Sequence, residues 1–104
     1  MIDIRAIDTP GPGGAQHIYE LSGPSKLLIR LNFQKGGVLE EGVNGVTHEA
    51  LMAVIIHRLQ AFQAGPFACR ENAIALTKLE ESLMWLNKRT RDRMARGVEG
   101  KTVL

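Results

Sequence analysis

The most distinctive chemical grouping in this sequence is an aromatic ring and an amide on either side of a short turn. Phe62 and Asn72 flank the segment Gly65-Pro66-Phe67, which interrupts the pattern of the residues around it. An aromatic ring offers a nucleobase a stacking surface worth about 1–3 kcal/mol, and an amide can both donate to and accept from a base edge. The pair could bind an adenine-like base. An ordinary core phenylalanine and a capping or solvent-exposed asparagine would explain the same two residues.

Arginines form a second grouping near the C-terminus. Arg89 and Arg93 are four residues apart, so on a helix they share one face, where two guanidinium groups could bind phosphates. Arg96 continues near that face, and residues 88–101 carry six basic side chains against two acidic ones. Cations are also favoured at the C-terminus of any helix. Spacing alone leaves both interpretations open.

No pattern typical of catalysis or of a metal site accompanies these residues. His17, His48 and His57 lack the spacing of metal ligands, and the adjacent carboxylates Glu80 and Glu81 diverge on a helix. The sequence contains no Walker-type glycine-rich loop and no serine in a nucleophile elbow. We therefore expect no catalytic residues, no metal and no cofactor.

Composition indicates a small globular protein. The chain has 104 residues, 44% hydrophobic and 23% charged, which is enough for one small core. Its apolar runs are too short to span a bilayer, and the acidic residues of MIDIRAID do not suit a signal peptide. The single cysteine, Cys69, agrees with a reducing compartment and is expected to be a small buried residue at a helix start, although a helix N-terminus can also make a thiol reactive.

Two kinds of element must position the candidate residues. Up to about residue 45, alternating apolar and polar residues predict strands at 2–4, 17–21 and 26–33, with a loop at 9–14 and a hairpin turn at 22–25. A possible fourth strand lies at 38–41, between glycines. The short connections predict that these strands form an antiparallel meander. Helical spacing then predicts one helix from the cap Thr47 to Gly65-Pro66, and a second over about 68–95 with Gly97 as its stop. The short connection makes the helices antiparallel neighbours.

We therefore predict an α+β fold over residues 1–104 as a single domain. A small antiparallel β-sheet occupies about residues 1–45, the two-helix hairpin about 46–97 and a tail 98–104. The second helix, at about 42 Å, exceeds the first, at about 24 Å. Leu83-Met84-Trp85-Leu86 places apolar groups on every side of the helix near the point where this excess begins. This predicts an oligomer, because a surface helix is apolar on one side only.

Several short motifs, spread over residues 33–100, resemble the phage anti-Thoeris sponge family. They are FQ at 33–34, VNG at 43–45, FQAGPFACRENA at 62–73, LTKLEE at 76–81, WLN at 85–87, RT at 89–90 and RGVEG at 96–100. The helical hairpin of this family is related to that of the phage anti-CBASS cyclic-dinucleotide sponges. Residues 1–32 add little to the resemblance.

The resemblance implies a non-enzymatic protein that sequesters cyclic ADP-ribose-type immune signals in the host bacterial cytoplasm. Some members of the family also bind cyclic di- and trinucleotides in separate pockets, and dimers assemble into hexamers with ligands at the subunit interfaces. At matching positions, Phe62 and Asn72 look like the base-recognising pair, and Arg89 and Arg93 like the phosphate-binding pair of the cyclic-oligonucleotide pocket. We also expect Arg70 to bind the ligand, because of its positive charge and its proximity to Phe62 and Asn72 in the sequence.

Two other functions are compatible with the residues alone. A nucleic-acid-binding hairpin would use the basic stretch 88–101, although the net charge of +2 is small for general attraction to nucleic acid. A structural assembly module would use the apolar part of the second helix only to join subunits. The resemblance favours the sponge, with no membrane and no nucleic acid polymer as partner.

Overall fold

The computed structural model describes residues 1–101. These residues form two compact units, one of residues 1–47 with Gly100 and Lys101, and one of residues 48–99. Residues 102–104 of the predicted tail lie outside the described residues, and the assignment of both parts to a single domain stays a prediction.

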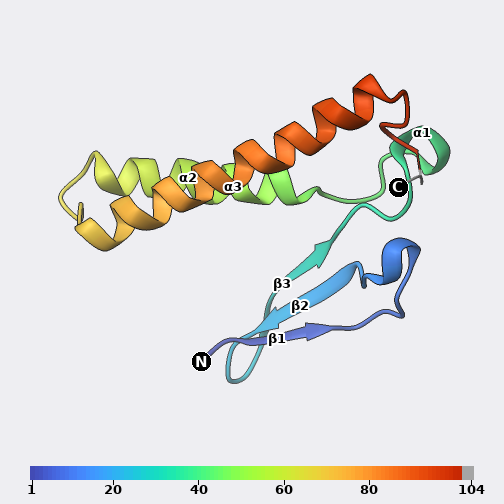
Figure 1. The fold of residues 1–104 in the computed structure, drawn as a ribbon. Coiled ribbons are helices and arrows are strands. Elements are labelled where there is room, and N and C mark those ends of the chain that lie inside the picture. The colour runs from blue at the N-terminus through green and yellow to red at the C-terminus, as the bar shows by residue number, and fades with distance from the viewer. Residues whose placement is uncertain (102–104) are drawn as a thin grey trace. The chain divides into compact units, whose positions relative to one another are not determined.

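The first unit contains a three-stranded antiparallel sheet (Figure 1). Its strands are β1 (Asp3–Ala6), β2 (Ile18–Ser22) and β3 (Leu27–Asn32), in the order β1-β2-β3. Gly23 closes the β2–β3 turn by donating its N–H to the carbonyl of Lys26 at 2.9 Å. The predicted meander and its hairpin turn are confirmed.

The connection between β1 and β2 is the predicted loop with one short helical turn in it. This turn, η1 (Pro12–Gly14), is of the 3-10 type and contains Gly13 at φ 77°. The carboxylate of Asp8 accepts hydrogen bonds from the backbone N–H groups of His17 and Ile18, each at 3.0 Å. These bonds join the two ends of the loop, and the one from Ile18 is the main cause that lowers the pKa of Asp8 below its usual 3.8.

The prediction of a fourth strand at residues 38–41 is wrong. Val38–Glu41 form a single helical turn, α1, between Gly36 at φ 79° and Gly42 at φ 73°. Left-handed backbone at both glycines reverses the chain, which an extended strand cannot do. The residue that returns to the end of β3 is Val46, which forms a parallel bridge with Phe33.

Two amide side chains close the loop that contains α1. Gln34 Nε2 donates to the carbonyl of Gly42 at 2.7 Å, and Gln34 Oε1 accepts from the N–H of Asn44 at 3.0 Å. Asn44 in turn accepts from the N–H of Lys35 and donates to its carbonyl, both at 2.8 Å. These contacts give a structural role to the motifs at residues 33–34 and 43–45.

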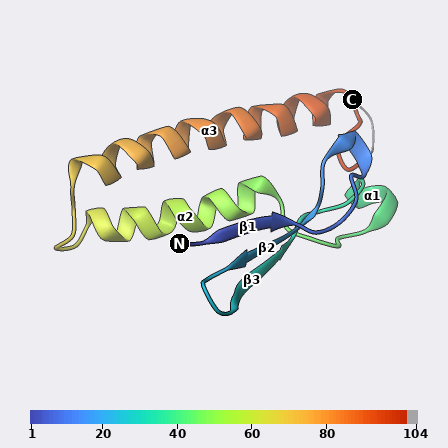
Figure 2. The ribbon, with the colours of Figure 1, turned by 90° about the horizontal axis from the view of Figure 1, so that it is seen from below.

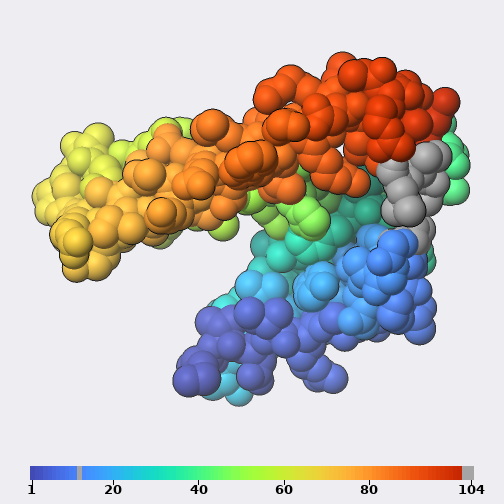
Figure 3. All heavy atoms as spheres, in the orientation of Figure 1, coloured from blue at the N-terminus to red at the C-terminus, as the bar shows by residue number. Residues whose placement is uncertain are grey.

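The second unit is the predicted antiparallel helical hairpin (Figures 1 and 2). Helix α2 spans His48–Gln63 and helix α3 spans Arg70–Ala95. Their side chains pack along the shared length of the hairpin (Figure 3), where Ile56 is buried with 8% of its surface exposed. Helix α3 begins two residues later than predicted because Cys69 is extended and caps it.

The excess length of α3 is as predicted. Its 26 residues against 16 in α2 leave ten without an equivalent, or about 15 Å. Met84 and Trp85 are 68% and 64% exposed, whereas Leu83 and Leu86 are half-buried. Apolar side chains therefore lie on both the exposed and the covered sides of this part of α3. Within residues 1–101, no helix is long and apolar enough to cross a membrane.

Candidate functional site

The turn between α2 and α3 is braced by Gln63. Its side-chain amide donates to the carbonyl of Cys69 and accepts from the N–H of the same residue, both at 3.1 Å. The N–H of Gly65 donates to the carbonyl of Phe62 at 3.2 Å, which completes the end of α2. The last turn of α2 and the first residues of α3 are therefore tied by side-chain and backbone hydrogen bonds together.

Cys69 is exposed, so the prediction of a small buried residue is wrong. The reason is its position, since the extended backbone of the N-cap directs its sulfur along the helix end. Its Sγ accepts a 3.4 Å hydrogen bond from the N–H of Asn72. The thiol thus takes the capping role that serine or aspartate more often has.

Phe62 is half-buried at the end of α2. The Cζ atom of Arg58 lies 5.1 Å from the centroid of its ring, in a cation–π contact. The ring of Phe67 is 6.3 Å away and tilted by 52°. Phe67 itself is 71% exposed, so the turn presents an aromatic pair with a cation beside it.

Asn72 lies in the first turn of α3, at the same end of the hairpin as Phe62. It is half-buried, and its side-chain amide makes no hydrogen bond to any of residues 1–101. Its two donors and its acceptor are therefore unengaged within the described residues. Arg70 is exposed at the first residue of α3.

Sequence reasoning missed Arg58 at this end of the hairpin. The available indication was its spacing, because a residue four positions before Phe62 on a helix lies directly beside it.

Among residues 1–101, the histidines do not form a recognisable ligand-binding group with other side chains. Within the described part of the chain, no three side chains of histidine, cysteine, aspartate or glutamate come together as a metal site would require.

The two arginines of the second predicted site differ in their surroundings. Arg89 is exposed, whereas the side chain of Arg93 is only 10% exposed. Arg93 Nη2 donates to the carbonyl of Val98 at 3.1 Å, and its Nε lies 3.4 Å from Oε2 of Glu99. Arg93 is therefore paired with the carboxylate of Glu99 in its own chain. Glu99 is a second residue that sequence reasoning missed.

The end of α3 explains why Glu99 reaches Arg93. Gly97, at φ 73°, donates its N–H to the carbonyl of Met94 at 3.0 Å, and Val98 donates to that of Arg93 at 3.0 Å. This pair of bonds is a Schellman motif, which ends a helix and folds the following residues back over its last turn. Gly97 is the predicted stop, and the fold-back places Glu99 at Arg93.

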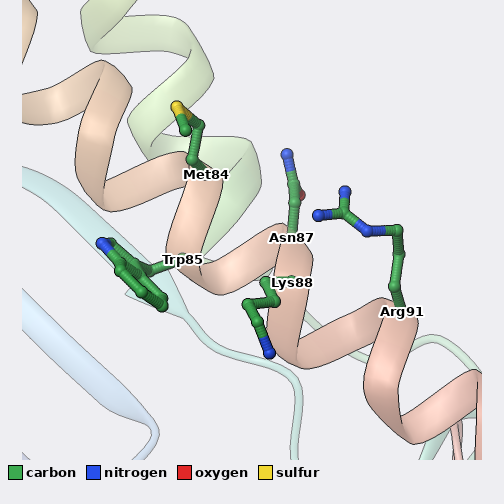
Figure 4. Close-up of a pocket in the computed structure, with 5 residues that line it drawn as sticks. All are labelled: Met84, Trp85, Asn87, Lys88 and Arg91. Atoms are coloured by element: carbon green, nitrogen blue, oxygen red, sulfur yellow. The ribbon is translucent and has the colours of Figure 1, made fainter.

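A shallow hollow of about 210 Å³ lies on the second half of α3, lined by Met84, Trp85, Asn87, Lys88 and Arg91 (Figure 4). The guanidinium of Arg91 extends toward Asn87. Lys88 forms a 2.8 Å ion pair with Asp92. Ligand sites that enclose a small molecule are usually about 300–1,000 Å³, so this hollow is too small and open to enclose a cyclic nucleotide by itself.

Comparison with known proteins identifies the hairpin. A curated relative, "Thoeris anti-defense 1" of Bacillus phage SBSphiJ7, is 54% identical over 90 residues, which is 86% of this chain and 63% of the relative. The chain thus spans somewhat less than two thirds of that protein's length. Residues 26–91 match the family model "Acb2/Tad1, hairpin domain", a range that includes Phe62, Arg70, Asn72 and Arg89. The chain therefore belongs to the Acb2/Tad1 hairpin family, as the resemblance predicted.

Proposed function

We propose that this protein is a non-enzymatic sponge that binds cyclic ADP-ribose-type immune signals in the host bacterial cytoplasm and so blocks an anti-phage defence. The observation that carries the proposal is the 54% identity to a phage protein named for Thoeris anti-defence. The unbonded amide of Asn72 and the aromatic pair at the hairpin turn, of half-buried Phe62 and exposed Phe67, support it. Binding and sequestration need stacking, donors and cations, but no nucleophile or general base.

The same proposal assigns two separate pockets. Phe62, Asn72 and Arg70 bind the ADP-ribose-type signal at the turn of the hairpin. Arg89 and Arg93 bind phosphates of cyclic di- and trinucleotides near the end of α3. Asn72 and Arg89 are 17 positions apart on α3, or about 25 Å along the helix. One small ligand therefore cannot contact both groups within a single chain.

Assembly into dimers and then hexamers is part of the proposal. A sponge that competes with a sensor at nanomolar levels needs about −12 kcal/mol of binding free energy. The shallow hollow on α3 and the exposed Met84 and Trp85 support a neighbouring subunit that completes the enclosure. Aromatic residues and methionine are enriched in the cores of such interfaces.

Native mass spectrometry of the protein purified from cells that produce defence signals tests subunit number and ligand mass together. The proposal predicts an oligomer carrying the mass of an intact cyclic ADP-ribose-type molecule. A ligand-free monomer from such cells would contradict it. Protein from cells without the defence system is the control for ligands acquired from general metabolism.

A further inference from the structure

We propose that Glu99 is a built-in competitor for the phosphate-binding guanidinium of Arg93, and that a ligand phosphate binds there by displacing its carboxylate. The inference deepens the proposed function and rests on its assignment of Arg93 to the cyclic-oligonucleotide pocket. It assigns to Glu99 the control of affinity in that pocket.

The contact between the two side chains is close but poorly satisfied. Glu99 Oε2 is 3.4 Å from Arg93 Nε, yet this oxygen is buried and has no hydrogen-bond partner among the described residues. A buried acceptor without a donor costs free energy, and a charge-assisted hydrogen bond is stronger than an ion contact alone. The carboxylate is thus held mainly by charge, which makes it replaceable by a better-fitting anion.

Exposure gives the carboxylate a route away from Arg93. The Glu99 side chain as a whole is 41% exposed, against 10% for Arg93. Rotation of the Glu99 side chain can therefore place its carboxylate in water, whereas Arg93 remains bonded to the carbonyl of Val98. The backbone of the Schellman motif need not change.

A ligand phosphate and Glu99 cannot share Arg93 without a penalty. Both are anions, and two like charges held about 4 Å apart near a protein surface repel each other more strongly than they would in water. Binding must therefore include the departure of Glu99 from Arg93. Neutralising Glu99 removes both the competition and the repulsion.

The test measures the affinity for a cyclic trinucleotide by isothermal titration calorimetry. We expect E99Q to bind about three- to tenfold more tightly than the unmodified protein, equivalent to about 0.7–1.4 kcal/mol. D92N is the matched control, because it removes one negative charge near the same helix end from the exposed pair of Asp92 with Lys88. Its gain should be smaller, since exposed ion pairs contribute little.

The outcomes separate the inference from the function on which it rests. If R93A loses affinity but E99Q binds no more tightly than D92N, the role of Glu99 is overturned and the pocket remains. If the unmodified protein binds no cyclic trinucleotide, or R93A binds as well as it does, the pocket itself is overturned. Should E99Q fail to fold, E99D withdraws the carboxylate by one methylene and is expected to tighten binding in the same direction.

Discussion

The guanidinium of Arg58 lies against the ring of Phe62, with Cζ 5.1 Å from the ring centroid. Both residues are on α2, one helical turn apart. A nucleobase that stacks on Phe62 would therefore meet a ring that is already oriented by a cation. The ring and the cation thus lie together at one end of the hairpin.

Replacing Phe62 or Asn72 with alanine should weaken the binding of cyclic ADP-ribose-type ligands more than that of cyclic trinucleotides. Loss of a stacking ring costs about 1–3 kcal/mol, and loss of the Asn72 amide removes hydrogen bonds to the base edge. Calorimetry with both ligands measures the two effects. I74A, a truncation at a 45% exposed position of α3, is the control. Equal losses for both ligands would refute two pockets.

Arg58→Ala should weaken the ADP-ribose-type ligand by about two- to fivefold, because an exposed cation–π contact contributes about 0.5–1 kcal/mol. Arg58→Lys should retain part of the affinity, since it keeps the charge but not the planar guanidinium. H57A changes the neighbouring exposed side chain of α2 and should have little effect. Affinity unchanged in Arg58→Ala would remove this residue from the site.

Arg89→Ala and Arg93→Ala should show the reverse ligand preference, with cyclic trinucleotides weakened more. They should differ from each other in stability. Arg93→Ala removes the bond to Val98 and leaves Glu99 unpaired, at a cost of about 1–3 kcal/mol, whereas Arg89 is exposed. Thermal unfolding without ligand measures this difference, and R91A is the control on another face of α3. Equal stability of the two variants would contradict a stabilising role for the contacts of Arg93 with Val98 and Glu99.

The hairpin was the most predictable part of the fold. Gly65, Pro66 and Gly97 end helices for local reasons, and the structure places the ends of α2 and α3 within a few residues of the predicted positions. Residues 38–41 were not predictable in this way. Their position between glycines suited a short strand, but the positive φ of those glycines and the pairing of Val46 with the end of β3 decide the conformation.

The candidate sites, like the fold, have one part that could be predicted from the sequence and one part that could not. The positions of Phe62 and Asn72 at one turn follow from helix boundaries, which sequence patterns report. The burial of Arg93 and its contact with Glu99 depend on the fold-back of the chain after Gly97. These two residues are six apart in the sequence, a spacing that does not by itself predict a contact. The capping sulfur of Cys69 was missed because cysteine usually packs as a small buried hydrophobe.

Asp8 makes the first unit sensitive to acid. Its pKa is lowered in the folded protein, chiefly by the N–H of Ile18, so its stabilising effect is complete above about pH 3.8 and is lost as the pH falls through the lower folded-state value. The protection of the Ile18 amide from hydrogen exchange should fall on acidification in the unmodified protein and less so in D8N. D3N, at an exposed position of β1, should behave like the unmodified protein. Identical pH dependence in D8N would exclude this role.

The proposed function requires that the protein holds its ligand without changing it. The most direct measurement is to mix excess purified protein with a cyclic ADP-ribose isomer, remove the protein by filtration, and analyse the filtrate and the heat-denatured protein by mass spectrometry. A sponge is expected to remove the isomer from the filtrate and to release it intact and in full amount after denaturation. Recovery of a chemically altered product, or a filtrate that still contains all of the isomer, would contradict it.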